Sequence, residues 1–201
     1  MKNSYLLVVV VVLALIGGYF VFFNQTQETL SFDLGLTELN SFYEKQELKP
    51  VYLASSLKVY AIEESKLNTL KSDLTSFQSS LEKQENSEDK EKLLLLTELH
   101  LDLVSIALMQ KQNFDLIDFF DETDFDADVL CSELDKAEQL QQGIALQSES
   151  AESFNAKVSA YSSAYPDEAV KAELTSLELD VSSDEDLDEL QSVLDALKVV
   201  C

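Results

Sequence analysis

Apolar residues recur at steps of three and four positions along most of the chain beyond residue 50, which is the spacing of one face of an α-helix. Between residues 51 and 85 this stripe is interrupted at Glu64, where a charged residue takes an apolar position. The pattern predicts one helix over 51–85 that packs along a seam of bundle or coiled-coil type. The stripe consists of Leu53, Leu57, Tyr60, Leu67, Leu70, Leu74, Phe77 and Leu81.

Three further arms of similar length are predicted. Residues 88–121 are apolar on most sides, which predicts the most buried helix, and residues 127–164 carry a second long stripe. Pro166 begins a last arm that is interrupted at 180–183. Because the connections are short, the predicted fold is all-α, an antiparallel (up-down-up-down) long-helix bundle with arms of about 35 residues. Helical repeats are the alternative, although their helices are shorter and the chain shows no convincing internal match.

The start of the chain has a different pattern. Residues 5–23 carry no charge, and at about 1.5 Å per residue a helix of this length approaches the thickness of a bilayer's hydrocarbon core. The segment lacks the small-x-small cleavage motif of a signal peptide, because bulky residues follow Gly17 and Gly18. A retained transmembrane signal-anchor helix is therefore favoured over a cleaved signal peptide.

The lysines predict how this helix is oriented. Lys2 precedes the segment, and the next lysine is Lys45. The positive-inside rule then predicts a single-pass protein of the cell membrane with a cytoplasmic N-terminus and an extracytoplasmic C-terminal domain. The predicted parts are a cytoplasmic N-terminus (1–4), the transmembrane helix (5–23), a tether with a short helix at 37–48 (24–49) and an extracytoplasmic helical bundle (50–201).

The charge of the chain limits the classes of partner. Fourteen lysines, no arginine and 38 acidic residues give a formal net charge of −24. Such a chain repels nucleic acid and anionic lipid surfaces, because binding to phosphates needs clustered basic side chains. A cationic partner is compatible with it: a metal ion, a basic protein or a polyamine. The simpler interpretation is that the acidic surface keeps the domain soluble.

One acidic segment is a candidate calcium site. Asp124, Asp126 and Asp128 alternate as the first ligands of an EF-hand loop do, and Asp135 falls at the twelfth position. The match is incomplete, because Val129 stands where the loop needs glycine and the twelfth ligand is not glutamate. The favoured interpretation is an acidic start to the helix at 127–164, stabilised by the helix dipole, with weak or no Ca²⁺ binding.

The residues typical of catalysis are scarce. His100 is the only histidine, and it lies among leucines on the apolar side of the helix at 88–121, so a buried, hydrogen-bonded histidine is expected rather than a catalytic one. No Gly-x-Ser-x-Gly elbow or glycine-rich phosphate loop is present. Glu98 and Asp102, one helical turn apart, are interpreted as a solvated pair. The sequence therefore predicts neither an enzyme nor a cofactor.

The two cysteines predict a disulfide. Cys131 and Cys201 are the only cysteines, and export would place both in a compartment where disulfides persist. Tyr165 follows Cys131 by 34 residues, and Cys201 follows Asp167 by the same number. An antiparallel hairpin folded at Pro166 would bring both cysteines level. The alternatives are two free thiols or a bond between two chains through Cys201.

The favoured function is a structural or protein-interaction role. Residues 5–23 would tether a surface that binds another membrane or envelope protein, and no binding of nucleic acid is expected. A Ca²⁺-dependent surface module and, less favoured, an enzyme of unknown class remain as alternatives. The path of the chain yields one geometric prediction, because residues leaving the membrane should enter the bundle at its near end unless the short first helix reverses the path. The turn at 82–92 is then expected far from the bilayer, and the turn at 113–128 near it.

Overall fold

The computed structural model describes residues 30–121, 131–166 and 168–179, together with scattered positions between 188 and 201. Every regular element in these residues is helical, which confirms an all-α fold with long helices. The predicted transmembrane segment at 5–23 lies outside the described residues. The helices are α2 (Phe32–Lys45), α3 (Pro50–Leu53), α4 (Ser56–Tyr60), α5 (Glu64–Glu82), α6 (Glu88–Asp121), α8 (Leu134–Ala164) and α9 (Glu168–Thr175).

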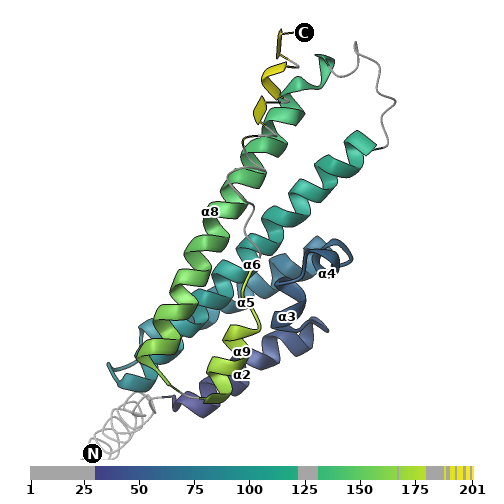
Figure 1. Ribbon diagram of the computed structural model, residues 1–201. Coiled ribbons are helices and arrows are strands. Elements are labelled where there is room, and N and C mark those ends of the chain that lie inside the picture. Colours follow the sequence, from purple (N-terminus) through teal and green to yellow (C-terminus); the bar gives the residue numbers. More distant parts are fainter. Residues whose placement is uncertain are drawn as a thin grey trace, which may run out of the picture.

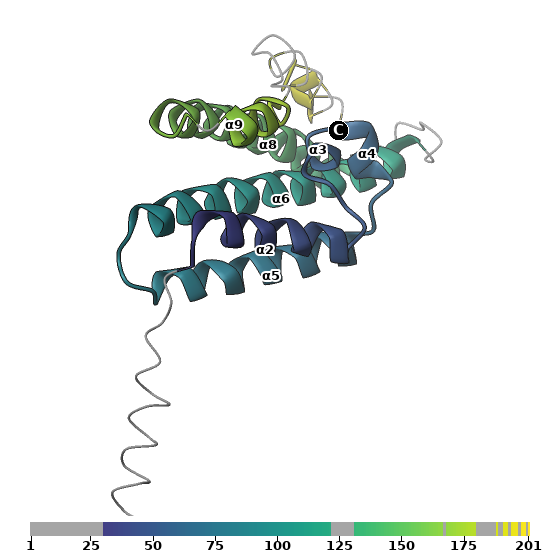
Figure 2. The same ribbon diagram turned by 90° about the horizontal axis from the view of Figure 1, so that it is seen from below.

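Helix α6 lies at the centre of the fold, with the bounds that its pattern predicts (Figures 1 and 2). It contacts α2, α3, α4 and α5 on one side and α8 on the other. Among the described helices, α6 alone is long and apolar enough to span a membrane, and more than half of its apolar stretch is buried inside the protein. Packing on both sides therefore accounts for its apolar circumference. Its buried apolar residues are Leu93, Leu96, Leu99, Leu103, Val104, Ile106 and Ala107.

The turn between α5 and α6 is stabilised by a buried lysine. The Lys90 ammonium donates hydrogen bonds to the carbonyl oxygens of Glu82 (3.0 Å) and Gln84 (2.7 Å) and to Asn86 Oδ1 (3.2 Å). Glu82 is the last residue of α5, where a helix leaves carbonyl groups without intrahelical partners, and Gln84 lies in the turn that follows. At the start of α6, the Lys90 N–H donates to Ser87 Oγ, so that serine caps the first turn of the helix.

The predicted single helix over 51–85 is wrong, because the structure divides this segment into α3, α4 and α5. Leu57, a member of the predicted stripe, is 88% exposed. Val59 and Ile62, which lie off the stripe, are buried in the core instead, because the bends at residues 54–55 and 61–63 turn them inward. Four arms of equal length are therefore not observed: α5 has 19 residues and α9 has 8.

Helix α2 begins at Phe32, five residues before the predicted start at Thr37. Gly35 lies within it and is buried, and a Cβ atom at this position would overlap the side chain of Leu93 on α6. The glycine is therefore a site of close helix approach rather than a helix breaker. Because α6 also supplies an acceptor, Asp89 Oδ2, for the Phe32 N–H (3.1 Å), the first turn of α2 is capped from another helix.

The start of α2 also corrects the predicted path of the chain. The Leu30 N–H donates to Gln84 Oε1 (3.2 Å), so residue 30 lies beside the turn between α5 and α6. From there α2 runs back along α5 and α6 before the chain enters α3 (Figure 2). The prediction that the turn at 82–92 lies at the far end from the chain's entry is therefore wrong. The short first helix reverses the path.

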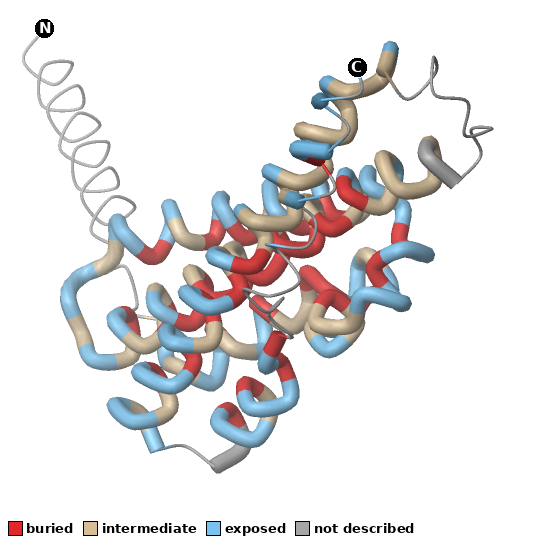
Figure 3. Tube along the Cα trace, turned by 45° about the horizontal axis from the view of Figure 1, so that its top comes forward, coloured by how far each residue is buried: buried red, intermediate tan, exposed pale blue. Residues whose placement is uncertain are grey.

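The outer halves of α6 and α8 extend beyond the other helices as a two-helix arm (Figure 1). Figure 3 shows that buried positions concentrate at the middle of the fold, whereas the arm is mostly intermediate or exposed. Gly143 on α8 lets the two helices approach at Asn113, whose side-chain amide donates to Gln147 Oε1 (2.8 Å). Helix α8 remains continuous through this glycine.

The end of the chain lies along the arm. Lys198 pairs with Glu138 of α8 at 2.8 Å, and the side chains of Gln141 and Gln191 are hydrogen-bonded at 2.9 Å. Near the tip, Cys131 and Cys201 lie within disulfide distance, with Cα atoms 5.2 Å apart. The predicted pairing of these two cysteines therefore agrees with their positions.

Candidate functional site

A groove open to solvent follows the line where α6 and α8 meet, and Lys157 divides it into two hollows. The first, here called the carboxylate hollow, has a volume of about 370 Å³, and the second, the tyrosine hollow, about 270 Å³. The carboxylate hollow is lined by Asp102, Ser105, Ile106, Met109, Glu149, Ser150, Ser153 and Lys157. The tyrosine hollow is lined by Leu95, Glu98, Leu99, Lys157, Ala160, Tyr161, Ala164 and Tyr165.

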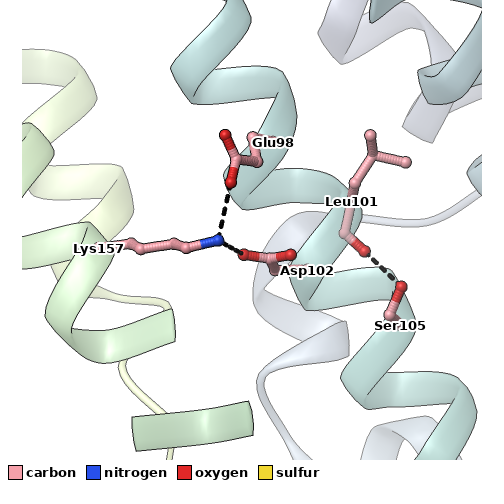
Figure 4. A network of polar contacts seen from close by, with 5 residues as sticks. All are labelled: Glu98, Leu101, Asp102, Ser105 and Lys157. Carbon is pink, nitrogen blue, oxygen red and sulfur yellow. Dashed lines mark hydrogen bonds and ion pairs between the residues drawn. The ribbon is translucent and has the colours of Figure 1, made fainter. Parts of the chain in front are cut away.

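An ion-pair network spans the groove between these hollows (Figure 4). The Lys157 ammonium lies 2.8 Å from Glu98 Oε1 and 2.8 Å from Asp102 Oδ2. Glu98 and Asp102 project from the same side of α6 because they are one turn apart. Hydrogen bonds to Asp102 and Glu98 raise the pKa of Lys157. The two carboxylates remain partly solvated, as the sequence predicts, because all three side chains are between 35% and 47% exposed; the shared lysine was not predicted.

The tyrosine hollow combines apolar surface with aromatic faces. Leu95 is 44% exposed beside it, and the rings of Tyr161 and Tyr165 pack with centroids 5.1 Å apart. The Lys92 ammonium lies 5.4 Å from the centre of the Tyr165 ring, a cation–π distance. The same ammonium pairs with Glu88 at 2.7 Å, a contact that raises the pKa of Lys92. Lys157 lines both hollows, and Lys92 lies beside the Tyr165 ring of the tyrosine hollow.

The predicted calcium ligands are only partly described. Asp124, Asp126 and Asp128 lie outside the described residues. Asp135 is exposed in the first turn of α8. Within the described part of the chain, no three histidine, cysteine or acidic side chains converge as a metal site requires. The described residues therefore do not complete a site of three or more such ligands around Asp135.

His100 is buried at the contact of α2 with α6, as its apolar neighbours predict. Its side chain is 3% exposed, and Nδ1 lies 2.7 Å from the Tyr43 hydroxyl. Burial lowers the pKa of His100 to about 4, so the ring is neutral at pH 7, and its tautomer decides which partner donates in the hydrogen bond between Nδ1 and the Tyr43 hydroxyl. Burial, together with the charge of Glu173 on α9, raises the pKa of Tyr43. The pair is a buried, hydrogen-bonded part of the fold, and neither side chain lines the groove.

Sequence reasoning missed the role of Lys157. In the sequence, the lysine and its two carboxylates are separated by more than fifty residues, and only the register of α6 against α8 brings them together. That register depends on the length of the connection between the helices, which periodicity does not define. Tyr161 continues the apolar stripe of the predicted helix at 127–164, but the stripe alone does not indicate that an open hollow lies beside it.

No protein-family model, curated protein or solved structure matches this chain. The α6–α8 groove is the candidate binding surface among the described residues. Its side chains supply carboxylates, hydroxyl groups, aromatic faces and apolar contacts along two antiparallel helices. Such a surface is suited to binding a protein segment, because long shallow grooves between helices accept a further helix through alternating apolar and charged contacts.

Proposed function

We propose that the chain is a single-pass membrane protein whose helical domain lies outside the cytoplasm and docks another membrane or envelope protein. The uncharged segment at 5–23 and the position of Lys2 support the anchor and its orientation. The net charge of −24 keeps the domain away from anionic lipid and leaves its surface available for a protein.

The observation that carries this proposal is the attachment of residue 30 to the turn between α5 and α6. Leu30 and Phe32 are hydrogen-bonded to Gln84 and Asp89, so the described domain is fixed to this turn from residue 30 onward. Residues 23 and 30 are separated by seven Cα–Cα steps, which span at most about 25 Å in any conformation. The domain is thereby held close to the bilayer, where a neighbouring membrane protein is within reach.

The cysteines support the same location. The positions of Cys131 and Cys201 allow a disulfide that closes a loop with a sequence separation of 70 residues. Disulfides persist outside the cytoplasm and are rare inside it. A bond between these cysteines would hold the end of the chain against the arm formed by α6 and α8 and would be consistent with export.

Protease treatment of intact cells tests the location. We expect a protease added outside the cells to digest residues 30–201 without lysis, and mass analysis without reductant to find the two thiols protected from alkylation. Protection of the domain until lysis would contradict the orientation. A mature protein that starts near residue 24 would show cleavage and contradict the anchor.

Cross-linking in intact membranes tests the docking function. A photoreactive residue placed at exposed positions of the helical domain should give a defined cross-linked product with a membrane or envelope protein. If cross-linkers distributed over the surface of α5, α6 and α8 give no product except with lipid, the docking function is wrong.

A further inference from the structure

We propose that the α6–α8 groove binds a basic amphipathic helix of the docked protein, and that in the free protein Lys157 occupies the position that a cation of the partner takes in the complex. The inference rests on the proposed docking function and adds the binding surface and the chemistry of the partner. It is carried by the combination of two adjoining hollows, three carboxylates and a lysine that lies across the groove.

The dimensions of the groove match a short helix. On α6 the lining extends from Leu95 to Met109, which corresponds to about 21 Å at the rise of an α-helix. A partner helix of about fourteen residues covers this length. Because α8 borders the groove on its other side, the partner would lie against two helices at once, as helices do in groove-binding complexes.

The charges select a basic partner. Three carboxylates, from Glu98, Asp102 and Glu149, stand against Lys157, so the lining has a net charge of −2 within a chain whose net charge is −24. A second copy of this chain would bring like charges together, which disfavours self-association. Lysine or arginine side chains on one face of a helix would pair with the carboxylates, while its apolar face fills the tyrosine hollow.

Lys157 shows how such a cation is held. Its ammonium group reaches from α8 across the groove and contacts both Glu98 and Asp102 at 2.8 Å (Figure 4). The pair is partly exposed, so the flexible lysine can withdraw into solvent when another cation takes its position. Lys157 therefore competes with the partner, and its removal should strengthen binding rather than weaken it.

The first test uses this expected gain. The full chain is held in neutral detergent micelles and titrated against a dye-labelled fourteen-residue helix with leucines on one face and lysines on the other. We expect Lys157→Gln to tighten the dissociation constant by threefold or more. Lys71→Gln is the matched control, because Lys71 is exposed on α5 and its loss changes the net charge equally. Equal tightening by both variants would show a general charge effect and would overturn the inference.

The second test removes the carboxylates. We expect the triple variant Glu98→Gln, Asp102→Asn, Glu149→Gln to weaken binding of the same peptide tenfold or more. The control variant, which removes three exposed carboxylates from other helices and loops, should change it less than twofold. Similar losses in both proteins would overturn the inference. The control substitutions are Glu44→Gln, Glu63→Gln and Glu82→Gln.

The third test blocks the groove without changing charge. Ala160 is exposed on α8 and lines the tyrosine hollow, so Ala160→Trp should fill the hollow and abolish binding of the peptide. Ser159→Trp, at an exposed neighbouring position outside the lining, is the control. If both variants bind as the natural protein does, the groove is not the binding surface. If Ala160→Trp instead turns a dimer into a monomer in sedimentation, a second copy occupies the groove and the inference is wrong.

The peptide-binding tests and the cross-linking test in membranes can reject the groove and the docking function independently of each other. A cross-linked partner in intact membranes together with unchanged peptide binding by Ala160→Trp would retain docking and reject the groove. The absence of any cross-linked protein would reject the docking function, whatever the peptide measurements show.

Discussion

The buried His100 makes a prediction about how stability depends on pH. Burial lowers the pKa of His100 from 6.5 to about 4 in the folded chain, so the unfolded chain binds an additional proton between these values. The contribution of neutral His100 to the free energy of unfolding is therefore fully present above pH 6.5 and is lost as the pH falls toward 4. With 1.36 kcal/mol per pKa unit, the whole effect is about 3 kcal/mol, of which about 2 kcal/mol falls between pH 7.5 and 5.0.

Urea unfolding of the full chain in micelles, followed by circular dichroism at pH 7.5 and 5.0, measures this change. Both pH values lie above the isoelectric point of about 4.1. The control is His100→Asn, whose side-chain oxygen can accept the hydrogen bond from Tyr43 but does not titrate. We expect the free energy of unfolding of the natural protein to fall by about 2 kcal/mol more than that of the variant.

The comparison removes the contribution of other titrating groups. Glu173 lies near Tyr43, and burial raises the pKa of Glu173, so its contribution to stability has the opposite sign: it is lost as the pH rises through that raised value. Because this carboxylate is present in both proteins, it cancels in the difference. If the natural protein and His100→Asn show the same pH dependence, the histidine is not buried in its neutral form and the reasoning is refuted.

Three further predictions concern the disulfide, the buried lysine and calcium binding. Cys201→Ser should lower the free energy of unfolding by up to about 4 kcal/mol if the disulfide forms, as urea titration without reductant would show. Lys90→Met should cost about 1.5–3 kcal/mol by leaving carbonyl oxygens at the end of α5 unpaired, whereas Lys92→Met should cost less than about 0.5 kcal/mol. Calorimetry should find no site that binds Ca²⁺ with micromolar affinity. A micromolar site that disappears in Asp124→Ala would contradict this prediction.

The sequence predicted α6 well because local and tertiary signals agree there. Its residues are apolar on most sides, acidic residues follow Ser87 at its start, and the structure packs helices on both sides of it. The division into α3, α4 and α5 could not be predicted in the same way. Leu53 and Leu57 have helical spacing, but burying Val59 and Ile62 against the core favours a bent path, and no glycine or internal proline marks the bends.

The groove and the start of α2 depend on contacts between distant residues. Asp89 caps the first turn of α2 from a position 57 residues away, and space beside Leu93 decides that Gly35 fits inside a helix. Neither signal is present in the local sequence around residues 31–36. For the same reason, the sequence showed Glu98 and Asp102 as neighbours on one helix but not the lysine that pairs with them.

The turn between α5 and α6 links the stability of the domain to its proposed attachment at the membrane. Gln84 takes part in both: its carbonyl oxygen accepts a hydrogen bond from Lys90, and its side-chain oxygen accepts one from Leu30. Asp89, one residue before Lys90, holds Phe32 at the start of α2. Any change that loosens the turn therefore also loosens residues 30–32 at the start of α2. If residues 5–23 anchor the chain as proposed, these contacts would influence which end of the bundle faces the bilayer, and the buried lysine would contribute to the orientation of the groove as well as to the fold.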